Sequence, residues 1–332
     1  MQSDDNALPG ADQAAPLVAA VWAAFAVMLA FHFALLQNRS DVHGRYKPAW
    51  MRTADPVTGR VAPSYMAKCR LTSAALAAHF AGRCPGDLVG LHAASPAETC
   101  RWVAIDLDAH GDTDDPDANR RLAVSIYDTV KGLGFDALLL DSNGRGGFHL
   151  WIVFASPVPM ADAWRLGRWL VRDFAASGLG KIPEVFPKSP RLSGKRMGNW
   201  VRLPGRHHTR DHWTKVWDGA RWLDGEPAIL AILAVTGRDV AVEAVVPRDF
   251  EPRGRGASRP RPNIALGLAP EPSARRLPRP ARPSATSATS TARTTTRGSG
   301  WAWPCGSSAG KASPSGTPGR VRATSTGPRS WT

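Results

Sequence analysis

The chain has 332 residues, of which 43% are hydrophobic, and it carries 42 lysines and arginines against 28 aspartates and glutamates. This composition excludes full-length disorder and a disulfide-stapled miniprotein, and the length suits one large domain or two small ones. The net charge of +14 is unevenly distributed, because residues 251–332 hold 14 basic and only 2 acidic residues. The rest of the chain is nearly neutral, so the basic balance says little about its folded part.

The four cysteines form no CxxC pair, which excludes the usual spacing of a zinc finger. Unpaired thiols are typical of a reducing compartment, so we expect a cytoplasmic protein. Residues 14–36 form an uncharged apolar run long enough to span a bilayer. His32 lies inside this run, and Asp4 and Asp5 precede it where an anchor usually has cations. We therefore expect a buried first helix over residues 14–37 rather than a membrane anchor.

Further along, apolar residues recur with the periods of short helices and strands. Residues 38–66 are an exception, because turn formers and cations dominate them and predict mostly loop. Thr72 or Ser73 suits the N-cap of a short helix, and Gly134 suits the end of an amphipathic one. The expected helices cover residues 71–80, 118–133, 161–176 and 226–235, and the expected strands cover 102–108, 137–140, 148–154, 200–203 and, as a hairpin around Asp218-Gly219, 216–222.

The composition changes beyond Pro247, where Pro, Arg, Ser and Thr dominate and aliphatic residues almost vanish. We therefore divide the chain into a disordered N-terminus (1–13), a catalytic domain (14–247) and a basic disordered tail (248–332). Residues 284–332 have the amino-acid composition expected when a GC-rich gene is translated out of frame. We hypothesise that a frameshift replaced a further domain there.

Two aspartates stand out on the strand expected at residues 102–108. Asp106 and Asp108 lie two residues apart, so a strand directs both to one face and Ile105 and Leu107 to the other. Two carboxylates pointing together repel each other, and a divalent cation relieves that repulsion. Hard oxygen ligands suit Mg²⁺ or Mn²⁺. A strand-end turn with two solvated acids is the alternative.

A glycine-rich segment, Asp-Ser-Asn-Gly-Arg-Gly-Gly-Phe-His, covers residues 141–149. Its three glycines permit a close backbone approach, and exposed N–H groups can cradle an anion. Ser142 adds a hydroxyl and Arg145 adds a fork of donors for phosphate. His149 faces away from Phe148 and the core, toward the side where the aspartates are expected. A glycine hairpin with a structural histidine is the alternative.

Two later segments carry further charged groups. Glu184 supplies a third carboxylate and Lys188 a phosphate contact, unless this stretch is only a surface loop. Residues 202–213 mix arginines and histidines with Trp213, and Trp200 lies just before them. Cations beside aromatic rings suit a nucleic acid strand.

The order of these motifs is more informative than any one of them. A DxD strand is followed by a helix, a Ser…His strand, the segment Glu-Val-Phe-Pro-Lys (184–188) and the segment Gly-Asn-Trp-Val-Arg-Leu-Pro (198–204). That order resembles the archaeo-eukaryotic primase superfamily, most closely its primase–polymerase branch found in phages, plasmids and TOTE conflict systems. Residues 33–46 also resemble the lead-in of that branch. The resemblance covers roughly residues 25–236.

The resemblance implies an α/β (α+β) fold with an archaeo-eukaryotic primase-like catalytic core. Such a core is a small RRM-like antiparallel sheet with flanking helices, joined to an N-terminal α/β unit. It also implies a DNA primase or polymerase, a nucleotidyltransferase that makes or extends primers from NTPs or dNTPs on single-stranded DNA. A helicase or a missing C-terminal domain is the implied partner, and no membrane is.

The resemblance carries roles to individual residues. Mg²⁺ or Mn²⁺ is the implied cofactor, in a two-metal-ion reaction. The implied catalytic and metal-binding residues are Asp106, Asp108 and Glu184. The implied nucleotide-binding residues are Ser142, Arg145, His149, Lys188 and Arg202, and the implied nucleic-acid contacts are Arg206, His207, His208 and Arg210.

Two other functions fit parts of the pattern. A DxD strand behind an N-terminal anchor also describes a metal-dependent glycosyltransferase, but that class leaves the segments at 144–149 and 184–188 unexplained. The second alternative is a catalytically inactive nucleic-acid-binding module, in which the basic tail binds the nucleic acid.

Overall fold

The computed structural model describes residues 11–108, 115–194 and 197–252. These residues belong to one unit of the chain, Met1–Arg261, and Pro262–Thr332 form another. The disorder expected at 1–13 falls mostly outside the described residues, and so does nearly all of the tail expected from residue 248, with its frameshift hypothesis. Within the described ranges Cys69, Cys84 and Cys100 form no disulfide.

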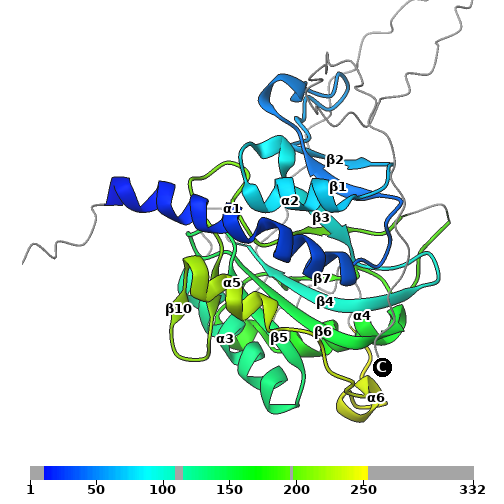
Figure 1. The fold of residues 1–332 in the computed structure, drawn as a ribbon. Helices are drawn as coiled ribbons and strands as arrows, with labels where there is room; N and C mark the ends of the chain where they lie inside the picture. Colours follow the sequence, from blue (N-terminus) through cyan, green and yellow to red (C-terminus); the bar gives the residue numbers. More distant parts are fainter. Residues whose placement is uncertain (1–10, 109–114, 195–196, 253–332) are drawn as a thin grey trace, which may run out of the picture. The chain divides into compact units, whose positions relative to one another are not determined.

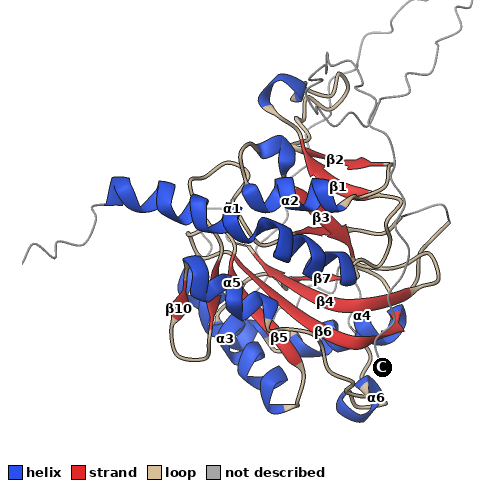
Figure 2. Cartoon of the chain, viewed as in Figure 1, coloured by secondary structure: helices blue, strands red, loops and turns tan. Residues whose placement is uncertain are grey.

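Within the described residues, six strands form the larger sheet. They are β4 (Thr99–Leu107), β5 (Asp136–Asp141), β6 (Phe148–Pro159), β7 (Glu184–Phe186), β9 (Lys215–Trp217) and β10 (Trp222–Leu223). All neighbours pair antiparallel, in the order β10-β9-β5-β6-β4-β7 (Figure 2). Both faces of the central strands are buried, which explains their near-continuous apolar runs. The strands predicted at 102–108, 137–140 and 148–154 are confirmed, as is the hairpin around Asp218-Gly219.

A smaller sheet joins segments that lie far apart in the sequence. Its four strands within the described ranges are β1 (His43–Tyr46), β2 (Ser64–Ala67), β3 (Val89–His92) and β8 (Trp200–Arg202), in the order β2-β1-β3-β8. Residues 38–66 are mostly loop, as predicted, but they also contain β1 and most of β2, which the sequence did not reveal and which pair along their whole length. Each of these two strands is only four residues long, and β1 also pairs with the distant β3, so a local pattern did not reveal them.

Three helices cover one face of the six-stranded sheet: α3 (Pro116–Gly132), α4 (Met160–Leu170) and α6 (Val242–Val245). The predicted stripe of Leu122, Ile126 and Val130 on α3 is buried there. The helix predicted at 161–176 is shorter than expected. Arg172 donates its backbone N–H and its Nη1 to the Trp169 carbonyl, so the chain leaves the α-helical path and continues as a 3₁₀ turn.

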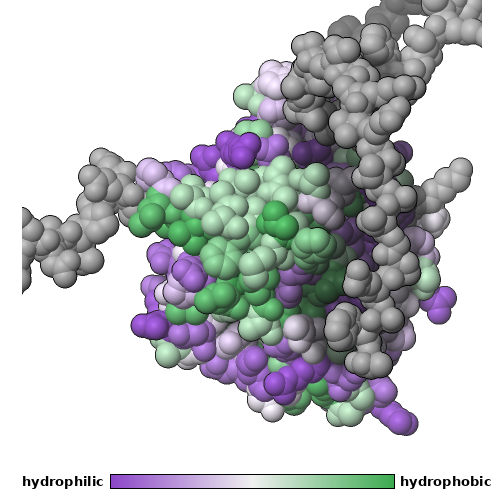
Figure 3. Space-filling view, in the orientation of Figure 1, coloured by the Kyte–Doolittle hydropathy of each residue, from purple (hydrophilic) through white to green (hydrophobic). Residues whose placement is uncertain are grey.

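The other face is covered by α1 (Ala11–Leu35), α2 (Ser73–Ala81, capped by Thr72 as predicted) and α5 (Gly225–Leu233) (Figure 1). Helix α1 buries Trp22 and Phe33 in this core but exposes Val27, Phe31 and Leu35 by 60–73%. The prediction of a buried first helix therefore holds for one face only, and Figure 3 shows the apolar surface over α1. By length and composition alone, Pro16–Leu35 is also apolar enough to cross a membrane.

Candidate active site

Three carboxylates lie together where β4 and β7 run side by side. Asp106 on β4 is the register partner of Glu184 on β7, and Asp108 follows directly after β4. Ile105 and Leu107 point to the opposite, α3-covered face of the sheet. The predicted alternation along this strand is therefore confirmed. Glu184 lies on a strand rather than in a surface loop, so it is held beside Asp106.

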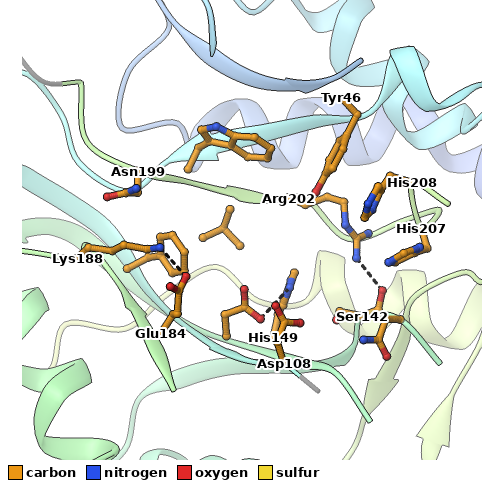
Figure 4. Close-up of a pocket in the computed structure, with 15 residues that line it drawn as sticks. Tyr46, Asp108, Ser142, His149, Glu184, Lys188, Asn199, Arg202, His207 and His208 are labelled. Atoms are coloured by element: carbon orange, nitrogen blue, oxygen red, sulfur yellow. Dashed lines mark hydrogen bonds and ion pairs between the residues drawn. The ribbon is translucent and has the colours of Figure 1, made fainter. Parts of the chain in front are cut away.

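The small sheet faces these carboxylates across a cavity of about 310 Å³ (Figure 4). Its strands β1 and β8 contribute Tyr46, Trp200 and Arg202 to the lining. One wall is thus acidic and comes from the large sheet, and the opposite wall carries an arginine and aromatic rings. The full lining is Tyr46, Asp106, Asp108, Ser142, Asn143, His149, Glu184, Phe186, Lys188, Asn199, Trp200, Val201, Arg202, His207 and His208.

The ionised form of Asp106 is strongly disfavoured in this cavity. Burial, and then the neighbouring carboxylates of Asp108 and Glu184, raise its pKa well above the usual range. Its Oδ1 is buried without a hydrogen bond, since His149 Nε2 lies 3.5 Å away. A buried carboxylate oxygen without a hydrogen-bond partner, beside two more carboxylates, has the oxygen-donor chemistry that Mg²⁺ and Mn²⁺ require.

Among the described residues, no three His, Cys, Asp or Glu side chains converge closely enough to hold a metal ion as they stand. Figure 4 shows Lys188 bound to the Glu184 carboxylate, with its Nζ 2.5 Å from Oε2. The donor set at Asp106, Asp108 and Glu184 fits a divalent cation by its chemistry. Its third carboxylate is engaged by an ammonium group instead.

Arg202 is the central cation of the cavity. Its side chain is buried, with Nη2 donating to the Ser142 carbonyl at 2.7 Å and Nη1 to the Arg206 carbonyl at 3.3 Å. These two hydrogen bonds fix the guanidinium between the glycine-rich loop and the segment after β8. The fixed charge also acts on its neighbours, since it lowers the pKa of His149 and His207.

His149 lies opposite Asp106 in the register of β4 and β6, on the cavity face as predicted. Burial, and then the charge of Arg202 and His207, lower its pKa to about 3. The imidazole is therefore neutral near pH 7. It can exchange a hydrogen bond with a ligand, but it contributes no positive charge.

The glycine-rich loop does not form the predicted cradle of N–H groups. Asp141 Oδ1 accepts from the N–H groups of residues 143 and 144, and Asn143 Oδ1 accepts from those of residues 145 and 147. The loop's amides are thus consumed by its own side chains. Gly146 has a φ of 80°, and a Cβ there would meet Pro116 at 2.3 Å, so glycine serves the shape of the loop.

Two side chains of this loop do not reach the cavity. Arg145 is exposed and lies outside the lining, so its contact with a nucleotide stays a prediction. The carboxylate of Asp141 lies 3.5 Å from His212 Nε2. Burial alone would raise the pKa of Asp141, but its interaction with His212 and the loop amides lowers it. Its charge is therefore compensated away from the cavity.

The four predicted nucleic-acid residues are largely engaged within the protein. Arg206 Nη1 donates to the Gly82 carbonyl at 3.1 Å and Arg210 Nη1 to the Asn143 carbonyl at 3.0 Å, and neither lines the cavity. His207 Nδ1 accepts from the N–H of Arg210 at 3.2 Å. His208 stacks on Tyr46 with ring centroids 4.3 Å apart. The two histidines do line the cavity.

Residues 39–218 match the family described as "TOTE conflict system, Archaeo-Eukaryotic Primase domain". The chain belongs to this family. The resemblance inferred from the motif order is confirmed, and membership in the archaeo-eukaryotic primases supports a nucleotidyltransferase-type role. The glycosyltransferase alternative finds no support. A helicase partner and a cytoplasmic location stay predictions.

Among solved structures, the chain is similar to the polymerase domain of Ligase D from Mycobacterium tuberculosis in complex with DNA, at 15% identity and a TM-score of 0.39. The similarity covers 67% of this chain and 89% of that one. Among curated proteins, no match was found.

The archaeo-eukaryotic primase cavity also contains residues to which the sequence analysis gave no role. Tyr46, Asn143 and Asn199 line it, and Tyr46 lies edge-on to Trp200 at 5.6 Å. Trp200 fits between the strands because a Cβ on Gly90 would meet its ring at 2.2 Å. The signal was present in the motifs that contain these residues, but only the pairing of β1, β3 and β8 brings them to the cavity.

Proposed function

We propose that this chain is a DNA primase–polymerase, which joins nucleotides on a single-stranded DNA template. The observation that carries the proposal is a cavity in which the carboxylates at β4 and β7, with His149 beside Asp106 on the same sheet, face Arg202 on the small sheet. A nucleoside triphosphate needs cationic and hydrogen-bonding groups at its phosphates and carboxylates near its reacting phosphorus. The family of the chain supports the same reaction class.

Different residues of the cavity would bind the nucleotide in different ways. Arg202 is oriented in advance by its two carbonyl partners, so its guanidinium loses little freedom when it binds a phosphate. The neutral His149 supplies a hydrogen bond at the floor of the cavity. Lys188, 20% exposed, provides a second cation beside Glu184. The hydrophobic side chains of Phe186 and Val201 exclude water from the same space.

Asp106, Asp108 and Glu184 would hold Mg²⁺ or Mn²⁺. Bound there, the metal would neutralise charge on the triphosphate and lower the pKa of the attacking hydroxyl. The unpartnered Oδ1 of Asp106 and the raised pKa of this carboxyl support that assignment. Lys188 Nζ binds the Glu184 carboxylate, so this ion pair would have to open before Glu184 could bind the metal.

The test is nucleotide incorporation by the full chain on single-stranded DNA, with Mg²⁺ or Mn²⁺, with and without a primer. We expect the double variant Asp106→Asn/Asp108→Asn to lose about a thousandfold or more in rate. Asp128→Asn, on the exposed face of α3, is the matched control and should keep the rate.

The outcomes separate the candidate functions. Product without a primer identifies a primase, and product only with a primer identifies a polymerase. A folded wild-type protein that binds DNA but makes no product would contradict the proposal and favour the binding module. A double variant within about tenfold of the wild-type rate would remove the carboxylates from the reaction.

A further inference from the structure

A β-hairpin of residues 47–63 connects β1 and β2 and extends from the edge of the small sheet (Figure 1). We call it the β1–β2 hairpin. It is an ordered ladder rather than a loose loop. The N–H of Lys47 donates to the Pro63 carbonyl at 2.8 Å, Ala54 pairs with Val61, and the N–H of Asp55 donates to the Arg60 carbonyl at 2.8 Å.

This hairpin carries the most exposed large aromatic side chain of the described residues. Trp50, on the short 3₁₀ turn Ala49–Met51, is 77% exposed. Val57 and Val61 are also exposed, by 91% and 49%. The indole face of Trp50 is therefore available to stack on a flat ligand without any rearrangement of the hairpin.

The charge around Trp50 is strongly one-sided. Residues 45–70 contain six lysines and arginines and one acid, Asp55. The Asp55 carboxylate accepts hydrogen bonds from the N–H groups of Val57 and Thr58 and from Thr58 Oγ1, which fixes it in the turn. Arg60 is exposed, and so are Lys68 and Arg70 after β2. An aromatic face among cations is the composition of a surface that tracks a single nucleic acid strand.

The β1–β2 hairpin is directly continuous with the cavity. Tyr46, the last residue of β1, lines the cavity and immediately precedes Lys47. The charge of Arg52 adds to burial and to Arg202 in lowering the pKa of His208, which lines the cavity as well. A nucleic acid strand whose end occupies the cavity therefore reaches the hairpin without crossing the rest of the protein.

We propose that the β1–β2 hairpin binds the single-stranded nucleic acid that serves as template, with the indole of Trp50 stacked on a base and the exposed Arg60 at the phosphates. The chemistry of the surface identifies a single strand, because a stacking face requires an unpaired base. Its identity as the template rests on the proposed function.

The experiment measures binding of the full chain to a fluorescent 20-nucleotide single-stranded DNA by anisotropy, between 50 and 200 mM salt, in EDTA and without nucleotide. Trp50→Ala should weaken binding about tenfold or more, and Trp50→Phe should recover most of that loss because it keeps a ring to stack. Arg60→Ala should reduce the slope of log K against log salt by roughly 0.7, the value for one lost contact to a single strand.

Matched controls come from other exposed surfaces. Phe31→Ala removes an exposed aromatic ring from α1, and Arg221→Ala removes an exposed arginine from the hairpin between β9 and β10. Both should bind as wild type does. Single-stranded RNA and duplex DNA of the same length distinguish the possible strands, and unchanged melting temperatures confirm that the variants fold.

Several results would overturn the inference. The inference is wrong if Trp50→Ala and Arg60→Ala bind single strands as tightly as the controls do. Equal losses on duplex DNA would indicate a backbone-binding surface instead. Vesicles containing anionic lipid serve as a further probe. If the variants lose affinity only for these vesicles, the hairpin is a membrane-binding surface instead. Binding is measured without metal or nucleotide, so this test does not depend on catalysis. If the protein makes no product but the variants lose affinity as expected, the proposed function is wrong and the role of the hairpin is retained.

Discussion

Two cation-rich segments flank the cavity, and they use their charges in opposite ways. In the segment after β8, the guanidinium groups of Arg206 and Arg210 donate to the carbonyls of Gly82 and Asn143. In the β1–β2 hairpin, Arg60 and Trp50 are exposed. The first segment resembled a nucleic-acid site in the sequence, whereas the second resembled an ordinary loop.

The difference shows that the number of cations in a segment does not measure its capacity to bind a polyanion. A guanidinium that satisfies a buried carbonyl stabilises the fold, and releasing it leaves that carbonyl unpaired. Only side chains that satisfy no buried carbonyl can move with a phosphate backbone without losing such a hydrogen bond. The segment after β8 is therefore a structural support for the cavity, and the hairpin is the better candidate for a nucleic-acid surface.

Among variants that test this difference, the largest effect is expected from Arg202→Lys, at the point where the segment after β8 is tied to the glycine-rich loop. Lysine keeps the charge but cannot reach both the Ser142 and Arg206 carbonyls. We expect kcat/KM for the nucleotide to fall about 100- to 1000-fold. Hydrogen exchange should increase over residues 206–213 and stay unchanged in the β1–β2 hairpin. An equal increase in hydrogen exchange in both segments would contradict the structural role assigned to the segment after β8 alone.

His79→Ala tests the anchor beneath the same segment. The buried His79 donates from Nε2 to the Pro204 carbonyl at 2.8 Å and accepts at Nδ1 from the N–H of Val89 at 3.0 Å. Losing the ring leaves both groups unpaired and opens a cavity, so urea unfolding at pH 7.5 should show a loss of about 3 kcal/mol.

The same variant has a defined pH dependence. Burial lowers the pKa of His79 to about 3 in the folded protein, below its value of about 6.5 in an unfolded chain. Its contribution is therefore complete above pH 6.5 and declines as the pH falls toward 3. At pH 5.5 the difference between wild type and His79→Ala should be smaller by about 1.4 kcal/mol. An identical difference at both pH values would contradict the neutral, doubly bonded imidazole.

Arg210→Ala should have a smaller, purely structural effect. It removes one hydrogen bond to the Asn143 carbonyl, which is worth about 1 kcal/mol of unfolding free energy. Affinity for single-stranded DNA should change less than about threefold, and less than in Arg60→Ala. If Arg210→Ala weakened DNA binding more than Arg60→Ala, the assignment of the two segments would be reversed.

Asp55→Asn should have the smallest effect and the opposite sign. The amide oxygen can still accept the hydrogen bonds of the turn, while the only acid of the β1–β2 hairpin is removed. Affinity for single-stranded DNA should rise about twofold at 50 mM salt, and the gain should disappear at high salt. A weaker complex at 50 mM salt would argue against phosphate contacts at the hairpin.

The central strands could be predicted because each is a long apolar run with both faces buried. The short strands β1, β2 and β7 could not, because they are only three or four residues long and are defined by pairing with other segments of the chain. The same distinction applies to the site. Period-2 alternation predicted the directions of Asp106 and His149, whereas local competition for amide hydrogens removed the expected anion cradle of the glycine-rich loop.

The sequence by itself determined the family, the order of the motifs and the face on which the two strand-borne groups lie, since these follow from local residue types and their spacing. Only the tertiary structure decided which charges face the cavity. Whether an arginine binds a ligand or a carbonyl depends on which backbone groups distant segments leave unpaired beside it, and no local pattern records that. Arg202 and Arg210 lie eight residues apart, and one faces the cavity while the other supports the loop behind it.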